Sequence, residues 1–415
     1  MPTNYQTRFR QYLKALTGDY TKIAKVDFLN PDGSVAFTVD NTRKSSKRGA
    51  LLQQGTISCN FQNGMRRTAS VVLSNLNDEY DYNVNKIWFG TNVRISEGLI
   101  LPDKTEFYIP QGVFGIQDPG ESLHPGQKLA TLNLVDKWAY LDGTLFGNLD
   151  GIYEVPVGSP IFPAMASILN FDRGNGQVID PVAPIFTSYY NGKTQTLPDG
   201  SIVNLTDMPY TLRVDSDSGT YADVILGMND ILVGVIGYDR NGRFRVEPSQ
   251  DDLDDKDKEV LWDFSLTQKN FLGATYRIMN SETYNDIIVQ GESQDDYRQP
   301  YGRAQNVNPQ SDLSIYGALG IRTKRLSASG YYSDDQCQAL ADWTLKRQCL
   351  LKKSVTIESS QIFHIDENKL VTIRRTDKEG EPVERHLVTG FSRPIAQTGA
   401  MTVNATSVED YVLTA

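Results

Sequence analysis

The histidines of this chain are few, and only one of the three has neighbours that could help it to hold a metal. His124, His364 and His386 are far apart, and the run His364-Ile365-Asp366-Glu367 is the one local cluster of nitrogen and oxygen ligands. It lacks a second histidine and the i, i+4 spacing that places two ligands on one helix face. A surface turn is the simpler interpretation, and we assign no metal ligand.

Two acidic runs offer oxygen ligands for calcium. They are Asp215 to Gly219 and Asp251 to Glu259. Neither has the twelve-position loop with Gly at position six and Glu at position twelve. Helix capping accounts for the first run and solvation of a loop for the second, with calcium binding as the alternative for both.

Other patterns that carry chemistry are missing from the sequence. The three cysteines, Cys59, Cys337 and Cys349, are too few for a disulfide framework and form no CxxC pair. There is no glycine-rich phosphate-binding motif. We therefore predict no catalytic residues, no cofactor and no metal, which is typical of an assembly component rather than an enzyme. A glycosidase stays an alternative, because it needs only two carboxylates and these can be distant in sequence.

Composition and charge narrow the class of protein further. The 415 residues are enough for two or three domains, and 10% aromatic residues with 33 glycines favour short strands and turns. The net charge of −10 argues against stable nucleic-acid binding. No stretch approaches the roughly 20 apolar residues that span a bilayer, and no secretion signal is recognised. We expect cytoplasmic synthesis with free thiols.

The N-terminal residues 1–18 predict an amphipathic helix. Its apolar residues recur at helical spacing, and Gly18 follows as a stop signal. Such a helix either packs on its own domain, which is the commoner case, or docks on a neighbouring subunit. Phe9 and Tyr12 are therefore candidate subunit contacts.

Residues 19–149 predict a first β-barrel-like domain. A turn at Pro31-Asp32-Gly33 and another at Asn63-Gly64 separate strands of alternating apolar residues. Many strands at this spacing suggest a closed or nearly closed antiparallel barrel.

Residues 150–265 predict a proline-rich linker followed by an α+β subdomain. Phe162 to Leu169 is a possible short helix, and residues 173–200 are expected to be a surface hairpin or an extended loop. A second helix is expected to be capped by Ser218 or Asp217 and to end at about Leu232. A hairpin that turns at Asn241-Gly242 follows it.

Residues 266–415 predict a second β-barrel-like domain that is interrupted by a helix at 333–350. Ser333 with Gln336 has the pattern of a capping box. Trp343 and Arg347 are further candidate subunit contacts, and the polar excursion 292–312, followed by a return strand near Ile315, is a candidate contact loop. The predicted fold is mainly β with α+β insertions: two antiparallel β-barrel-like domains and a small helix-hairpin subdomain.

Seven segments, taken in order and spacing, resemble the baseplate hub proteins of tailed bacteriophages. This family is shared with contractile injection systems and with the N-terminal part of tail-associated lysins. Each segment is weak alone, and together they cover most of the chain. They are Gly55 to Ser58, Arg66 to Ser70, Ile109 to Phe114, Val135 to Leu141, Tyr238 to Pro248, Ser314 to Gly317 and Ser333 to Leu345.

The resemblance implies a homotrimer at the tail tip or baseplate of a virion. Two similar barrels in each subunit would give a ring with pseudo-sixfold symmetry, which adapts a sixfold tail tube to a threefold tip. The implied partners are the distal tail or tube protein hexamer, the tape measure protein and a tail-tip fibre or spike protein. DNA would pass through the central channel during genome ejection, and an acidic channel lining would suit this passage.

Two other functions stay as alternatives. One is a peptidoglycan- or carbohydrate-degrading enzyme of the virion. The other is a carbohydrate- or receptor-binding module, which the tyrosine- and tryptophan-rich strands would allow. Packing of the aromatic residues in a core explains these strands equally well.

Overall fold

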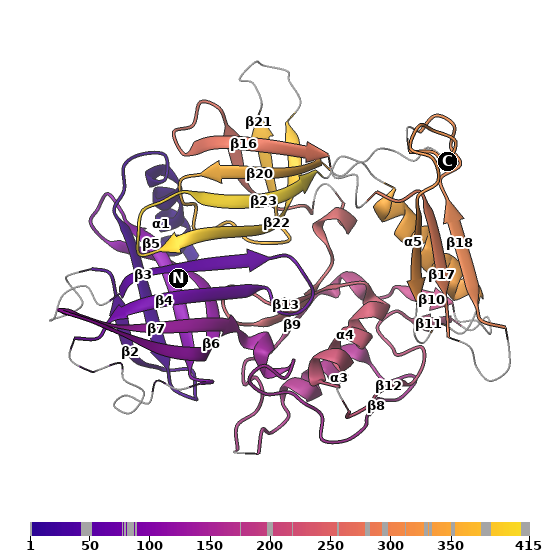
Figure 1. Cartoon of the computed structure of the whole chain (residues 1–415), viewed down its shortest axis with the longest axis horizontal. Coiled ribbons are helices and arrows are strands. Elements are labelled where there is room, and N and C mark those ends of the chain that lie inside the picture. Colours follow the sequence, from indigo (N-terminus) through magenta and orange to yellow (C-terminus); the bar gives the residue numbers. More distant parts are fainter. Residues whose placement is uncertain are drawn as a thin grey trace.

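The computed structural model is organised around one large β-sheet that includes strands from both ends of the chain (Figure 1). No helix in the described part of the chain is long and apolar enough to cross a membrane. The structure describes residues 2–42, 52–76, 78, 80, 87, 89–174, 176–196, 202–217, 219–254, 257–278, 283–292, 298–311, 313–327, 331, 334–349, 353–374 and 383–407.

Thirteen strands of the described residues form the large sheet, in the order β16-β20-β23-β22-β3-β4-β7-β6-β5-β1-β2. Strand β21 pairs with β22, and β15 pairs with β21. The N-terminal strands are β1 (Lys22–Leu29), β2 (Val35–Asp40), β3 (Leu52–Asn60), β4 (Arg67–Ser74), β5 (Asn92–Ile100), β6 (Glu106–His124) and β7 (Gln127–Asp136). The C-terminal strands are β15 (Val260–Ser265), β16 (Phe271–Ile278), β20 (Lys353–Ser359), β21 (Leu370–Arg374), β22 (Glu384–Ile395) and β23 (Met401–Ser407).

The prediction of a mainly β fold is confirmed, but the two sets of strands do not form separate closed barrels. Strand β3 pairs antiparallel with β22 over Gly55 to Asn60, so the two sets share one sheet. Each set thereby covers an edge that the other would leave open, and an uncovered edge invites pairing with another chain.

The hairpin at Asn63-Gly64 shows how the sequence sets this local structure. Strands β3 and β4 pair with Ser58 opposite Thr68, as the turn predicts. Gly64 has φ +104°, which favours glycine, and a Cβ there would lie 3.2 Å from Nε1 of Trp138. In β4, buried and partly exposed residues alternate, which gives the sheet one core-facing side.

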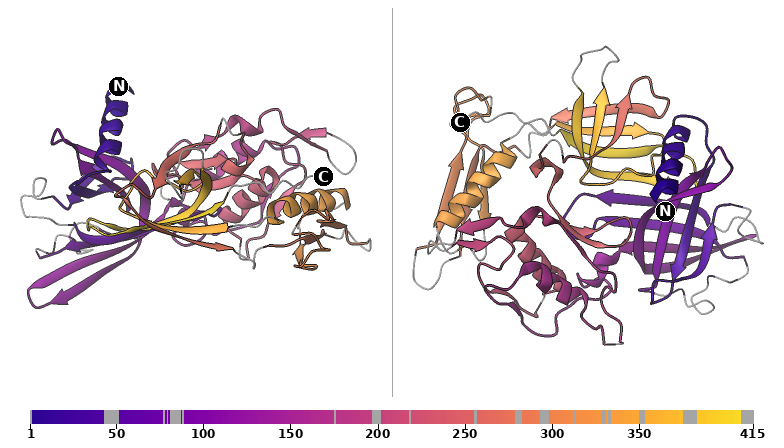
Figure 2. Two further views of the ribbon diagram at one scale, coloured as in Figure 1. Left: turned by 90° about the horizontal axis from the view of Figure 1, so that it is seen from above. Right: turned by 180° about the vertical axis from the view of Figure 1, so that it is seen from behind.

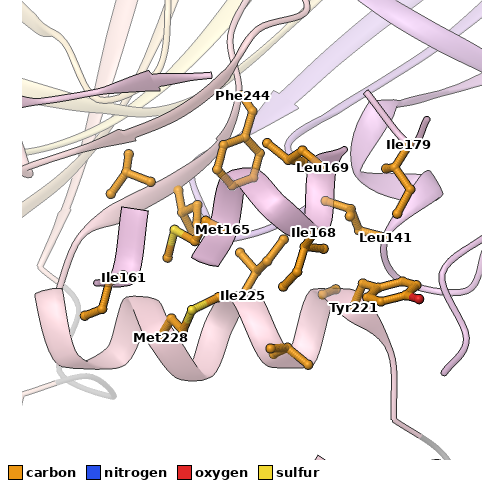
Figure 3. Close-up of a cluster of buried hydrophobic side chains, with 14 of the residues drawn as sticks. Leu141, Ile161, Met165, Ile168, Leu169, Ile179, Tyr221, Ile225, Met228 and Phe244 are labelled. Atoms are coloured by element: carbon orange, nitrogen blue, oxygen red, sulfur yellow. The ribbon is translucent and has the colours of Figure 1, made fainter. Parts of the chain in front are cut away.

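The middle of the chain forms a compact α/β unit whose apolar core lies between two helices (Figure 3). The predicted short helix is confirmed as α3 (Ile161–Leu169). The second helix, α4 (Tyr221–Leu232), ends as predicted. Its N-cap is Thr220 and not Asp217, because Thr220 and Asp223 complete a capping box; Ser218 lies outside the described residues.

Short strands complete the α/β unit, and they correct the expectation that residues 173–200 lie only on the surface. Strand β9 pairs in parallel with β14, and Ile179 and Tyr190 are buried in the core of the unit. The strands are β8 (Tyr153–Val155), β9 (Ile185–Phe186), β10 (Thr194–Thr196), β11 (Ile202–Asn204), β12 (Leu212–Val214), β13 (Val235–Tyr238) and β14 (Phe244–Glu247). Single 3₁₀ turns are η1 (Lys137–Tyr140), η2 (Ser188–Tyr190) and η3 (Gln250–Asp252).

A third unit stands apart from the large sheet and corrects the prediction for 284–350. Strands β17 (Asp286–Gln290), β18 (Tyr301–Gln305) and β19 (Thr323–Ser327) form their own sheet, and α5 (Asp334–Gln348) packs on it. The predicted polar excursion thus contains a strand, whereas the predicted return strand near Ile315 is a turn. Gly302 allows this packing, since a Cβ there would lie 2.3 Å from the backbone of Cys337. The predicted helix cap Ser333 and the side chain of Gln336 lie outside the described residues.

Candidate functional site

Eight neighbouring strands, from β16 to β6, present one side of the large sheet to solvent. They lie one beside another in Figure 1. Because side chains alternate between the two sides of a strand, the outward residues follow from the pairing register. Most of them carry a hydroxyl or an amide group and are partly or fully exposed. Examples from β16 to β7 are Thr275, Thr356, Thr402, Asn404, Ser392, Thr56, Ser58, Thr68, Ser70 and Asn133.

Hydrogen bonds across the strands connect these side chains. The hydroxyls of Thr56 and Ser70 are 3.1 Å apart, and Ser58 donates to Ser392 at 3.2 Å across the β3–β22 boundary. Charged residues also occur at outward positions, among them Asp118, Glu358, Arg277 and Arg385. We call this surface the hydroxyl face.

A shallow hollow on the hydroxyl face has no group for acid–base chemistry. Its lining contains no titratable side chain, so it has neither a general acid nor a nucleophile with a base. The face can form neutral hydrogen bonds and can exclude charge. The lining residues are Thr56, Ser58, Thr68, Ala69, Ser70, Gln117, Asn133, Leu134 and Val135.

The two sets of strands that share the sheet follow one plan. The order β3-β4-β7-β6-β5-β1 corresponds to β16-β20-β23-β22-β21-β15. The same irregularities recur: one extra residue lies early in β3 and in β16, at Gln53 and Leu272, and another lies midway in β6 and in β22, at Gln117 and Thr389. The chain therefore contains two equivalent units, which differ in that β1 pairs antiparallel with β5 whereas β15 pairs in parallel with β21.

A buried charge cluster secures the joint between the two units. Arg393 of β22 is fully buried, and its Nε donates to Oε2 of Glu97 in β5 at 2.7 Å. Lys22 of β1 lies 2.9 Å from the other oxygen of Glu97, and Gln111 accepts a further bond from Arg393. Burial lowers the pKa of Lys22, and the carboxylate of Glu97 partly offsets this effect. Removing one partner from a buried ion pair destabilises the fold, because the remaining charge is left without compensation.

A second buried cluster joins both units to the middle α/β unit. Arg67 of β4 bonds to Asp366 and Glu367 at 2.5 Å each, and Arg66 lies 3.3 Å from Glu367. Arg240, from the β13–β14 hairpin, donates to Asp366 at 2.8 Å. Burial raises the pKa of Glu367. Burial acts in the same direction on Asp366, but the two arginines outweigh it and hold the pKa of Asp366 well below its usual range.

The run from His364 to Glu367 is therefore a structural joint, and its interpretation as a surface turn is wrong. His364 and Glu367 are buried, and the carboxylates of the run bond to arginines. The imidazole Nε2 donates to the carbonyl of Leu261 at 3.1 Å, so Nδ1 is left to accept from the hydroxyl of Tyr12 at 3.0 Å. Within the described residues no group of three His, Cys, Asp or Glu side chains could hold a metal ion.

The predicted N-terminal helix is present as α1 (Pro2–Ala15), at one side of the molecule (Figure 2). Tyr12 is fully buried within the chain, where its hydroxyl also accepts from the backbone N–H of Phe363 at 3.0 Å. Phe9 is half-buried, with its ring centroid 6.4 Å from that of Phe107. Tyr5 is 56% exposed but lies on the same side of the helix, with its ring centroid 5.7 Å from that of Phe107. Helix α1 thus packs on its own chain, and any subunit contact would use the opposite side.

The other candidate contacts, Trp343 and Arg347, belong to α5, but their side chains lie outside the described residues. Their role at a subunit interface stays a prediction. Sequence reasoning missed the residues of the joint, Glu97 and Arg393. A signal for them exists, since each is a charged residue within an alternating series of apolar residues: Glu97 lies between Ile95 and Leu99, and Arg393 between Phe391 and Ile395.

The chain shares its fold with solved tail proteins, although no family model and no curated protein sequence matches it. The tail protein from Neisseria meningitidis MC58 superposes with a TM-score of 0.58 at 10% identity, over 95% of this chain and 98% of its own. The 43 kDa tail protein of prophage MuSo2 from Shewanella oneidensis gives 0.57 at 10% identity, over 93% and 98%. The prophage tail protein gp18 from Listeria monocytogenes EGD-e gives 0.51 at 9% identity, over 93% and 94%. The predicted resemblance is confirmed for the fold.

Proposed function

We propose that this chain is a structural hub of a phage tail tip or baseplate, and that it works as a homotrimer without catalysis. The observation that carries the proposal is the presence of two equivalent units side by side in one sheet. Three copies around a threefold axis would present six such units, a number that suits a sixfold tube. The other end of the same ring would offer threefold symmetry to a tip protein.

The hydroxyl face is the surface that we assign to the central channel. It spans both units without interruption, so three copies would provide a continuous lining. A lining of neutral hydroxyl and amide groups releases no counterions from DNA and so gives little affinity for it. We propose this lining in place of the acidic one that would also suit the passage: DNA would pass because most groups of the wall are neutral.

The proposed partners follow from the two ends of the ring. The sixfold end would contact the distal tail or tube protein hexamer and the tape measure protein, and the threefold end would contact a fibre or spike protein. The chain would be made in the bacterial cytoplasm and would reside in the virion. The fold shared with phage tail proteins supports this location.

Mass photometry of the purified chain tests the proposal most directly. We expect the mass of three 46.4 kDa chains and, by electron microscopy, a ring with an open centre and six similar lobes. A stable monomer at all concentrations, or a closed particle without a channel, would contradict it. Zymography on cell walls tests the enzymatic alternative, and clear lysis would favour an enzyme.

A further inference from the structure

Strand β6 is long, and its two halves have different neighbours. Its first half pairs with β5 as far as Gly115. Past the extra residue Gln117, residues 118–124 pair with β7 alone among the described residues. The far side of this second half is a strand edge, at one end of the hydroxyl face. Strand β16 provides a second edge at the opposite end.

Strand β22, the equivalent of β6, shows what such an edge does when it has a partner. Its first half pairs with β21 as far as Leu387. Past its own extra residue, Thr389, it pairs antiparallel with β3 from Gly390 to Ile395. The extra residue marks the point where β22 stops pairing with β21 of its own unit and begins to pair with β3 of the other unit. A β-bulge bends a strand in this way.

In the C-terminal unit, β16 occupies the place at the edge of the strand order that β3 occupies in the N-terminal unit, and it carries the same early bulge. We infer that the second half of β6 in one copy pairs antiparallel with β16 of a second copy, in the way that β22 pairs with β3 within a chain. This inference rests on the proposed ring and names the strands that would close it. The contact is head-to-tail, which generates a ring when the rotation closes.

The internal joint also gives the register of this contact. Opposite Arg393 and Pro394 of β22 lie Ile57 and Thr56 of β3. Moving both strands to their equivalents places Ser122 opposite Thr275 of the second copy, and Leu123 opposite Ala274.

The side chains at these positions are compatible with the pairing. Ser122 and Thr275 would continue the hydroxyl face across the copies, and Leu123, now 68% exposed, would be covered. Arg277 of the second copy would lie opposite Gly120, on the same side of the sheet as Asp118, which gives the contact opposite charges. Pro119 donates no hydrogen bond, so the ladder would begin after it.

A pair of engineered cysteines tests the register. The three native cysteines are buried, so the background of cross-linking is low. Ser122→Cys and Thr275→Cys on one chain would lie at directly opposite positions, within reach of a disulfide. After oxidation we expect a covalent trimer on a non-reducing gel. A mixture of the two single variants is expected to give covalent dimers, and either single variant alone to give none.

Two control pairs make the result specific. Ser58→Cys with Ser392→Cys repeats the geometry inside one chain, where the two hydroxyls are 3.2 Å apart, and should form an intramolecular disulfide. Ser122→Cys with Ala274→Cys shifts the register by one residue, which places the thiols on opposite sides of the sheet, and should form none.

The outcomes separate this inference from the proposed function. If the wild-type chain is a trimer and the Ser122–Thr275 pair does not cross-link while the internal control does, the strand assignment is wrong and the hub proposal stands. Covalent chains of increasing length in place of a closed trimer support the edge pairing and contradict the three-copy ring. A monomer without cross-links contradicts both.

Discussion

The N-terminal and C-terminal units of the large sheet share one strand order but differ in their insertions and in which strand edges are paired. In the N-terminal unit a short turn connects β3 to β4, whereas in the C-terminal unit the β17–β19 sheet and α5 stand between β16 and β20. Within the described part of the chain, the second half of β6 pairs with β7 alone, whereas the second half of β22 also pairs with β3. The shared strands therefore set the architecture, and insertions and edge contacts give each unit its own role.

The largest predicted effect is a difference in stability between substitutions at two equivalent positions, Arg393 in β22 and Glu121 in β6. Arg393 is fully buried against Glu97, whereas Glu121 is exposed and pairs with Lys128. Arg393→Met should lower the free energy of unfolding by about 3–5 kcal/mol, because it leaves part of a buried charge cluster without its partner. Glu121→Gln should change it by less than about 1 kcal/mol. Chemical denaturation measures both.

A double variant identifies the cause of this loss. Arg393→Met with Glu97→Gln removes both charges of the pair but also takes the carboxylate away from Lys22, so it should remain less stable than wild type. Its loss should nevertheless be smaller than the sum of the losses of the two single variants, because the ion pair is counted twice in that sum. If the two single losses simply add, packing of the Arg393 side chain accounts for the effect and the ion pair does not.

The second prediction concerns His364, which is buried in the connection between β20 and β21 of the C-terminal unit. Burial lowers its pKa from 6.5 to about 4, and the positive charges of Arg240 and Arg393 act in the same direction. The unfolded chain therefore takes up a proton as pH falls through 6.5, while the folded chain does not until about pH 4. Stability should fall by about 3 kcal/mol across this window and level off below it.

The variant His364→Gln isolates that contribution from those of the neighbouring carboxyl groups. The difference in unfolding free energy between wild type and variant should shrink as pH is lowered from 7 to 4.5, as followed by urea denaturation at each pH. A difference that is constant with pH would show that His364 does not titrate between the folded and unfolded states.

The third prediction tests whether the inserted β17–β19 and α5 unit is independent of the shared sheet. Gly302→Ala should destabilise that unit by about 1–3 kcal/mol, because the added methyl would overlap the backbone of α5. Hydrogen exchange should accelerate in α5 and β18 but not in β22. Gly273→Ala in β16 is the matched control, since a Cβ there meets no atom within 4 Å. Faster exchange throughout the large sheet would show that the unit is coupled to it.

Local elements could be predicted from the sequence, whereas long-range pairings could not. The Asn63-Gly64 hairpin, α3 and the end of α4 at Leu232 follow from turn and helix signals a few residues long. The pairing of β22 with β3 joins residues more than 300 positions apart, and nothing local specifies it. The same holds for the joint: Glu97 and Arg393 are individually visible as charges at positions where the alternation predicts an apolar residue, but their pairing depends on the fold.

The smallest effect is expected where α1 meets the C-terminal unit. The Tyr12 hydroxyl accepts from Phe363 and donates to His364, so Tyr12→Phe leaves a buried donor and a buried acceptor without a partner. The loss should be about 1–2 kcal/mol by denaturation. Phe9→Leu, on the half-buried side of α1, should cost less because it removes no hydrogen bond. If Phe9→Leu instead dissociates the oligomer while Tyr12→Phe leaves it intact, α1 serves a neighbouring copy as well as its own chain.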